Sequence, residues 1–202
     1  PAAAAAADDD DEKKNASSSA PPKKKKKKHA CRLVATSVSN SAFHGAAMDR
    51  QHIAGELGKF LELLERRHGL SRSALAASGM YLSHETGTHA TPSSSCSFNE
   101  IFALKQNFSA ADLSKLVLVN TKALTGHPMG VGFEDAFAAF ALSYGEHVPP
   151  LPADTVLDDH FDAPLNLPLL GSRQARRTDI KYALRFAAGF GSQVAFALYA
   201  RA

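Results

Sequence analysis

Apolar residues recur along the chain in short runs and in longer periodic stripes, and this pattern predicts alternating strands and helices. The runs at 33–38, 80–82 and 115–119 are typical of buried strands, and those at 180–186 and 194–199 predict a final pair of strands. Helical patterns lie between the first four runs. This order predicts an α/β fold in which helices cover a layered sheet.

A single apolar stripe predicts the first helix, between Asp49 and Gly69. Asp49 is a suitable N-cap, and Gly69 follows three basic residues in the last turn, where cations favour the negative end of the helix dipole. Ser71 is expected to cap one further turn. A second helix is expected over 99–107, after a Ser-rich loop at 91–97. The stripe consists of Ile53, Leu57, Phe60, Leu61 and Leu64.

The segment 128–144 is expected to form a third helix, buried on every side. Pro128 suits the first turn of a helix, and after Asp135 the interior is nearly all Ala and Phe, without a polar face. His127 would then lie at the positive end of the helix dipole, which favours a neutral imidazole. The proline-rich stretch 148–178 is expected to cross irregularly to the last two strands.

The first thirty residues differ in composition from the rest. They combine an alanine run, an acidic block, serines and the lysines Lys23–Lys28, with no apolar residue larger than Ala. Such a segment cannot bury enough apolar surface to fold, so we expect a disordered tail over 1–30 and one folded domain over 31–202. The lysine run holds six of the 23 basic residues, and the folded part has no basic stripe with interleaved aromatics. A solvated tail is therefore favoured over nucleic-acid binding or an import signal.

The chain offers no sign of a membrane span or a metal site. No apolar run approaches the ~20 residues of a span, and the N-terminus lacks the apolar core of a secretory signal. Cys31 and Cys96 have neither metal-ligand spacing nor a disulfide framework, which suggests a reducing compartment. We expect a cytoplasmic protein, or a plastid protein if a targeting segment precedes Pro1.

Polar residues that could perform chemistry follow three of the predicted strands. His84 follows 80–82, Lys122 and His127 follow 115–119, and a GFG turn joins the last two strands. The carboxyl ends of strands meet at one edge of an α/β sheet. Two neutral histidines and a backbone N–H there could stabilise an oxyanion or enolate. Taken singly, each residue also fits a structural role, and the other histidines, which show no paired spacing, are expected at the surface.

Four motifs occur in an order that resembles one known family. They are HETGT at 84–88, NTKALTGHPMG at 120–130, VPP at 148–150 and YALRFAAGFGSQ at 182–193. On these motifs the chain, over about 33–199, resembles the C-terminal half of a β-ketoacyl synthase, the ketosynthase of fatty acid and polyketide synthases. The resemblance implies the C-terminal half of a thiolase-like, layered α/β/α fold. It also implies an acyltransferase that performs decarboxylative Claisen condensation of acyl and malonyl thioesters.

The resemblance also implies residue roles and partners. His84 and His127 would hydrogen-bond the malonyl thioester oxygen as decarboxylation forms an enolate. No cofactor would bind directly, because the substrate is carried on the phosphopantetheine of an acyl carrier protein. Other implied partners are the N-terminal ketosynthase half and, in the complete enzyme, a second copy. The implied residues are catalytic His84, His127 and Lys122, oxyanion-hole and gate residues Phe190, Gly189 and Gly191, and supporting Glu134 (the ion-pair partner of Lys122), Thr86 and Thr125.

Several positions depart from the ketosynthase pattern. Glu85 replaces the usual Gly, His89 stands where Pro is common, 93–97 resembles an insertion, and the spacing from His127 to Glu134 is shorter by about two residues than the pattern implies. The nucleophile is a larger departure, because neither Cys31 nor Cys96 lies on a strand-to-helix turn that would activate a thiolate. We therefore expect this chain alone to be inactive.

Three other interpretations stay open at this point. The first is a non-catalytic, ketosynthase-like partner that shapes a dimer or holds a carrier protein, although such a protein would be free to lose both histidines. The second is a thiolase-fold enzyme that condenses without decarboxylation, which would carry a second cysteine in place of GFGSQ. The third is an ordinary α/β domain with buried structural histidines.

Overall fold

Five strands form one mixed sheet in the computed structural model, which describes residues 31–43, 47–87, 95–127, 132–144 and 179–202. The strand order is β1-β5-β4-β2-β3. β2 pairs in parallel with β3 and β4, whereas β5 is antiparallel to both β4 and β1. The strands are β1 (Cys31–Asn40), β2 (Gly79–Leu82), β3 (Val117–Val119), β4 (Tyr182–Gly189) and β5 (Gln193–Arg201).

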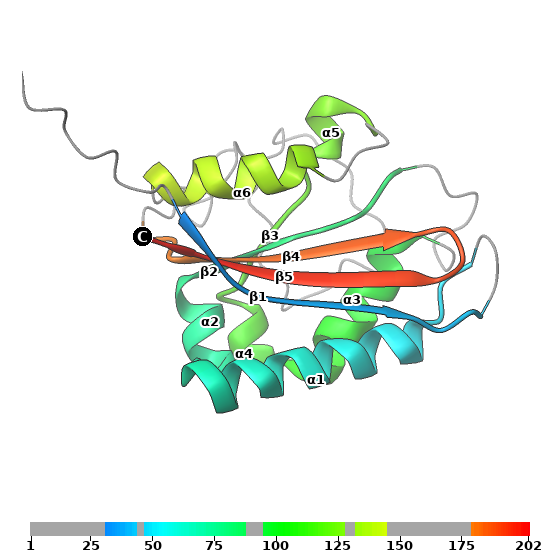
Figure 1. The fold of residues 1–202 in the computed structure, drawn as a ribbon, viewed down its shortest axis with the longest axis horizontal. Helices are drawn as coiled ribbons and strands as arrows, with labels where there is room; N and C mark the ends of the chain where they lie inside the picture. The colour runs from blue at the N-terminus through cyan, green and yellow to red at the C-terminus, as the bar shows by residue number, and fades with distance from the viewer. Residues whose placement is uncertain (1–30, 44–46, 88–94, 128–131, 145–178) are drawn as a thin grey trace, which may run out of the picture.

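Helices cover both faces of this sheet, which confirms the predicted layered α/β/α architecture (Figure 1). One face carries α1 (Arg50–His68), α2 (Arg72–Ser78), α3 (Cys96–Asn107) and α4 (Ala110–Leu113). On the other face lies α6 (Gly132–Tyr144), with the short α5 (Lys122–Thr125) near its N-terminal end. Helices α4 and α5 were not predicted, and α3 begins three residues before the predicted start at 99.

The four helices of the first face begin with a side-chain cap. The Asp49 carboxylate accepts hydrogen bonds from the backbone N–H groups of Gln51 and His52, as the sequence predicts. Gly69, with φ of 63°, ends α1 in the left-handed conformation. Three serines cap the other helices at their N3 amides: Ser71 for α2, Ser95 for α3 and Ser109 for α4.

The larger hydrophobic core lies between these helices and the sheet. All five residues of the predicted stripe on α1 are buried there. The Phe60 ring stacks on Phe196 of β5 at 5.9 Å between centroids, and Phe196 lies 5.1 Å from Phe186 of β4. The Phe186 ring in turn meets the His84 ring edge to face at 6.3 Å. Aromatic packing therefore connects the core to a residue of the predicted site.

Helix α6 is not buried on every side, so this part of the prediction is wrong. Its inner face contacts β4, β5 and β1, and its buried residues Ala138, Ala141 and Leu142 belong to a second core cluster that includes residues of β2, β3 and β4. On its outer face, Phe133, Phe140 and Tyr144 are 50%, 61% and 64% exposed, and the rings of Phe140 and Tyr144 lie 4.7 Å apart. The apolar composition predicted that other elements would pack against both faces of the helix. No helix or strand among the described residues packs against its outer face.

Strand β1 also differs from its prediction as a buried strand. Among the described strands it lies at the edge of the sheet and pairs only with β5, and Leu33 and Val38 are 55% and 79% exposed. No helix in the described residues is long and apolar enough to cross a membrane. The predicted tail at 1–30, Pro128 and the predicted crossing at 148–178 lie outside the described residues.

Candidate active site

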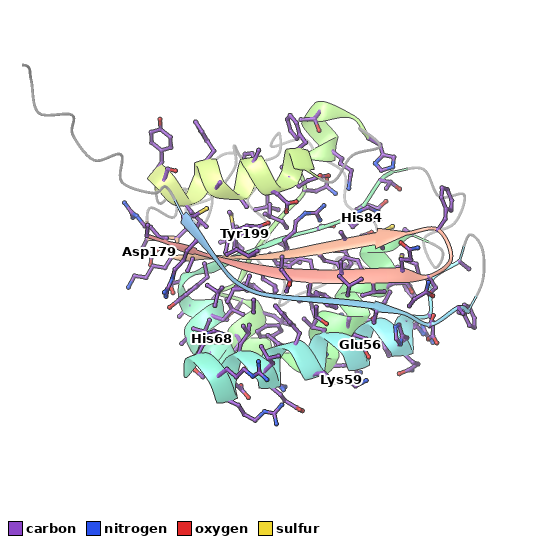
Figure 2. The ribbon with its side chains drawn as sticks, viewed as in Figure 1. Glu56, Lys59, His68, His84, Asp179 and Tyr199 are labelled. Carbon is purple, nitrogen blue, oxygen red and sulfur yellow. The ribbon has the colours of Figure 1, made fainter. Side chains whose placement is uncertain are left out.

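Two parallel strands bring His84 and Lys122 together. Leu82 of β2 pairs with Val119 of β3, so the segments that follow leave the sheet side by side. Asn120 joins them, because its amide donates to the Glu85 carbonyl at 2.8 Å and its side-chain oxygen accepts from the Lys122 backbone N–H at 2.7 Å. His84 lies toward the end of the sheet opposite Asp179 (Figure 2).

The buried Lys122 ammonium has three acceptors around it. These are Nδ1 of His84 at 3.3 Å, the carbonyl oxygen of His84 at 3.1 Å and Oε1 of Glu134 on α6 at 3.1 Å. An ammonium group has three N–H donors and no acceptor. Nδ1 of His84 must therefore accept, and in the neutral ring the proton lies on Nε2. Lys122 thus fixes the tautomer in which His84 can donate from Nε2.

The surroundings of His84 keep its ring neutral. Burial, and then the positive charges of Lys122 and Arg185, lower the pKa of His84 to about 3, although Glu134 opposes this shift. His127 meets this ring edge to face, with 6.1 Å between centroids and an interplanar angle of 86°. The two predicted histidines are thus brought together at a sheet edge, and the buried one is a neutral donor.

The predicted helix start at Pro128, directly after His127, lies outside the described residues, and α6 is described from Gly132 onward. His127 follows Gly126, which ends α5 with φ of 70°, and its side chain is exposed. Helix α5 spans Lys122–Thr125 and ends at Gly126, and Lys122 at its first position forms an ion pair with Glu134 of α6. His127 is therefore positioned by the α5 turn.

Glu134 is held between two buried cations. Its Oε1 lies 3.1 Å from Nζ of Lys122, and its Oε2 lies 3.4 Å from Nη2 of Arg185 on β4. Burial opposes ionisation, but the hydrogen bond from Lys122 and the charge of Arg185 outweigh it, so the pKa of Glu134 lies below its usual value. The three residues form a buried Lys–Glu–Arg triad, in which Glu134 lies between the two cations and compensates part of the charge of each.

The remaining predicted residues lie around this centre to different degrees. Phe190 lies in the β4–β5 turn with its ring 78% exposed, and the turn uses Gly191 at φ of 78°. Thr86 hydrogen-bonds the Cys96 thiol. Thr125 donates its hydroxyl to the Thr121 carbonyl at 3.2 Å, within its own helix, so its described contacts do not support Lys122 or the histidines.

Two buried charged residues of the site were missed by sequence reasoning. Glu100 of α3 accepts from the His84 backbone N–H at 2.9 Å and from the Ser83 hydroxyl at 3.1 Å, and burial raises its pKa to about 8. Arg185 is only 2% exposed on β4. Both interrupt apolar runs, SFNEIFAL and YALRFAAG, and a charge inside such a run is the signal that could have identified them.

Glu85 has a structural role that explains its departure from the ketosynthase pattern. One carboxylate oxygen accepts from the Gly87 backbone N–H at 2.6 Å, and the other accepts from the Ser97 N–H at 2.6 Å. Ser97 lies in the first turn of α3, where the helix dipole favours a negative charge. Glu85 therefore joins the segment after His84 to the start of α3.

Neither cysteine is activated. Cys96 is the first residue of α3, but burial raises the pKa of its thiol to about 12, and Glu100 and Glu85 reinforce the shift. Burial also raises the pKa of Cys31 at the start of β1. Because the thiolate is the nucleophile, both thiols are unsuited to attack. This supports the expectation that neither Cys31 nor Cys96 serves as the nucleophile of a condensing enzyme.

The fold is shared with parts of known ketosynthases. A ketosynthase in complex with a type II polyketide acyl carrier protein superposes with a TM-score of 0.64 at 16% identity, over 86% of this chain and 39% of that one. A β-ketoacyl synthase from Burkholderia phymatum gives a TM-score of 0.64 at 18% identity, over 86% and 38%. A ketosynthase from Xenorhabdus doucetiae, in complex with its chain length factor, gives 0.58 at 17% identity, over 86% and 39%.

The chain spans about two fifths of the length of these three ketosynthases. No protein-family model matches the sequence, and no curated protein matches it. At identities of 16–18%, these comparisons show a shared fold. It agrees with the thiolase-like architecture implied by the motifs.

Proposed function

We propose that this chain supplies the histidine and lysine part of a β-ketoacyl-[acyl carrier protein] synthase-like acyltransferase, which condenses acyl and malonyl thioesters with loss of CO₂. One observation carries the proposal. The rings of His84 and His127 lie edge to face at 6.1 Å, and Lys122 holds His84 in the tautomer that donates from Nε2. This arrangement supports two donors converging on one oxygen, as the enolate of a decarboxylating thioester requires.

In the proposed reaction, the thioester oxygen of the malonyl group accepts hydrogen bonds from the rings of His84 and His127. The bond between the carboxylate and the α-carbon breaks, CO₂ leaves, and the electron pair forms the enolate. The enolate carbon then attacks the carbonyl of an acyl group held on a cysteine, which leaves as thiolate. A donor that stays neutral strengthens its hydrogen bond as negative charge develops, without first giving its proton away.

The nucleophilic cysteine and the carrier protein are further parts of the proposal. Burial raises the pKa of both Cys31 and Cys96, which disfavours their thiolates, so the acyl group is proposed to reside on a cysteine in the part of a ketosynthase that this chain does not match. The malonyl group is proposed to arrive on the phosphopantetheine of an acyl carrier protein. Phe190, exposed at the β4–β5 turn, is proposed as the gate over that cysteine, and its backbone amide as an oxyanion donor.

The outer face of α6, made of Phe133, Phe140 and Tyr144, is proposed as the surface on which the rest of the ketosynthase packs. Exposed aromatic residues on one helix face mark an interaction surface. The three ketosynthases extend beyond the matched part by about three fifths of their length, which is enough for a second layered unit. Helix α6 would then lie between two sheets, and its apolar composition would be explained.

A second candidate function is a non-catalytic partner that shapes a ketosynthase dimer or holds a carrier protein. The exposed face of α6 supports it equally well, and a ketosynthase complexed with a chain length factor shares this fold. The Lys122–Glu134–Arg185 triad favours the catalytic proposal. A buried ion triad is costly compared with an apolar replacement, and a scaffold has no use for a fixed histidine tautomer.

Decarboxylation of malonyl-carrier protein tests the catalytic proposal, using the protein purified from its source with its native partners. Replacing His84 or His127 with Ala is expected to lower kcat by about 10²–10³-fold, the usual effect of removing one donor to an oxyanion. His68→Ala, at the exposed end of α1, is the control and should keep full activity. Wild-type decarboxylation by a folded His127→Ala protein would refute the mechanism and favour the non-catalytic role.

A separate measurement tests the packing surface. Phe140→Asp with Tyr144→Asp should prevent copurification of a chain that carries the cysteine-bearing part of a ketosynthase, identified by mass spectrometry. Val38→Asp, at an apolar position on β1 that is even more exposed, should not prevent it. Copurification that survives the double substitution would exclude this face, and concentration-dependent self-association lost in the same variant would assign it to a second copy instead.

A further inference from the structure

Arg185 is a buried cation in the middle of a strand whose neighbouring residues are apolar. Side chains alternate along β4, so Leu184 and Phe186 face the large core, whereas Arg185 faces α6. Only 2% of the residue is exposed. No guanidinium nitrogen has a hydrogen-bond partner among the described residues, although a guanidinium offers five N–H donors. Burial of this kind is expensive and calls for a specific role.

Two adjacent carboxylates of α6 face this guanidinium. Nη2 lies 3.4 Å from Oε2 of Glu134, and Nε lies 3.8 Å from Oδ1 of Asp135, which is partly exposed. These are ion-pair contacts without hydrogen-bond geometry. Lys122 takes the other oxygen of Glu134, so the two cations divide one carboxylate between them. With Arg185 on Oε2, Lys122 keeps two of its three N–H groups for Nδ1 and the carbonyl of His84.

We propose that Arg185 is a positioning residue of the site: it holds Glu134 through the oxygen that Lys122 does not use, and so keeps Lys122 directed at His84. The inference rests on the proposed function for its catalytic meaning. The geometry of the triad and the tautomer of His84 can be tested independently of any catalytic activity.

The charges around His84 make the consequence specific. Lys122, Arg185 and His127 act on the ring as positive or potentially positive groups, Glu134 acts as a negative one, and Glu100 holds the backbone N–H from the α3 side. Without Arg185, Glu134 has one cation left and competes for more of the Lys122 donors. Lys122 then turns away from Nδ1, the ring samples both tautomers, and a proton on His84 is opposed by one charge fewer.

NMR of the full chain with ¹⁵N-labelled histidine tests the inference without substrate. In the wild type, Nδ1 of His84 should have the shift of an unprotonated acceptor and Nε2 that of an N–H. Arg185→Gln should produce averaged shifts and raise the proton affinity of His84 by about tenfold, or one pKa unit. Arg185→Lys, which retains the charge, should restore most of the wild-type behaviour. Arg201→Gln, at the exposed end of β5, should change neither property.

Unchanged tautomer and proton affinity in a folded Arg185→Gln protein would overturn the inference, because a merely structural arginine would leave both intact. If this variant does not fold, the NMR signals of the Arg185 guanidinium in the wild-type protein test the inference instead. A positioning role requires separate, slowly exchanging Nη signals for Arg185, whereas averaged signals show free rotation and overturn it. Loss of decarboxylation is not a readout here, so failure of the proposed function and failure of this inference give different results.

Discussion

The two faces of the sheet satisfy their polar groups in different ways. On the face covered by α1, α2, α3 and α4, side-chain oxygens cap the start of each helix, and the core is apolar and aromatic. At the start of α5, on the other face, Thr121 makes no side-chain cap. The buried side-chain atoms without a hydrogen-bond partner, among the described residues, belong to Thr121, Glu134 and Arg185 on this side and to Glu100 of α3, next to His84.

This difference separates stability from chemistry. Unpartnered polar atoms in a buried position cost free energy, and here they gather around His84 and Lys122 and not in the larger core. The large core is connected to the site by Phe186, which contacts both Phe196 and His84. The α1 face can therefore stabilise a site that would be unfavourable on its own, and each prediction below compares the two regions.

The largest expected effect lies in the large core. Phe60→Ala should lower the free energy of unfolding by about 3–5 kcal/mol, because it removes a buried ring stacked on Phe196 and leaves a cavity. Phe140→Ala, the same change on the exposed face of α6, should alter it by no more than about 0.5 kcal/mol. Urea denaturation followed by circular dichroism measures both. Equal losses would mean that the exposed face of α6 is already covered in the isolated protein.

The next effect compares a buried with an exposed ion pair. Glu134→Gln leaves Lys122 and Arg185 without their shared carboxylate and should cost about 3 kcal/mol of unfolding free energy. Glu56→Gln removes the partner of Lys59, whose side chain is 74% exposed, and should cost less than about 1 kcal/mol despite the 2.7 Å contact. The same denaturation experiment compares them. A small loss for Glu134→Gln would show that the triad is hydrated and only weakly coupled.

The pH dependence of stability should show two opposing limbs. His84 has a pKa of about 3 in the folded state, below its usual 6.5, so the unfolded chain binds the extra proton and stability falls as the pH drops below about 6.5. Glu134, with a lowered pKa, adds to this loss at lower pH. Glu100 has a raised pKa of about 8, so its contribution is lost as the pH rises from about 4.5 through 8.

Stability should therefore be greatest near pH 5–6, with about 1.4 kcal/mol at stake for each unit of pKa difference. Urea denaturation from pH 4 to 9 measures the two limbs. Glu100→Gln should flatten the alkaline limb alone, because its amide oxygen can still accept from the His84 backbone N–H, and His84→Gln should flatten the acid limb. A Glu100→Gln protein with an unchanged alkaline limb would contradict burial as the cause of the raised pKa.

The same division explains what the sequence could predict. The α1 helix was predicted with both ends correct, because Asp49, Gly69 and the apolar stripe are local signals that agree with one another. His84, Lys122 and Glu134 were placed at one site by motif order, and the structure brings these three side chains into contact. Arg185 and Glu100 were missed because their partners lie on other helices and strands, and the periodicity of the surrounding sequence does not indicate such partners.

Helix α6 shows the limit of reading burial from composition. Its mixture of Ala and Phe correctly indicates that both faces are apolar, but a pattern cannot say whether the cover of the second face belongs to the described residues. The predicted start of this helix at Pro128 lies outside the described residues and stays a prediction, and the described part of the helix begins at Gly132.

The smallest expected effect reverses sign between the two regions. Asp49→Ala removes the cap of α1 and should lower the free energy of unfolding by about 1 kcal/mol. Thr121→Val replaces a buried hydroxyl that has no partner among the described residues with a methyl group of the same shape, so it should leave stability unchanged or raise it by up to about 1 kcal/mol. Thermal unfolding of the two variants decides the point. A loss for Thr121→Val as large as that for Asp49→Ala would show that its hydroxyl is satisfied by water, and that the site is better hydrated than its protein contacts indicate.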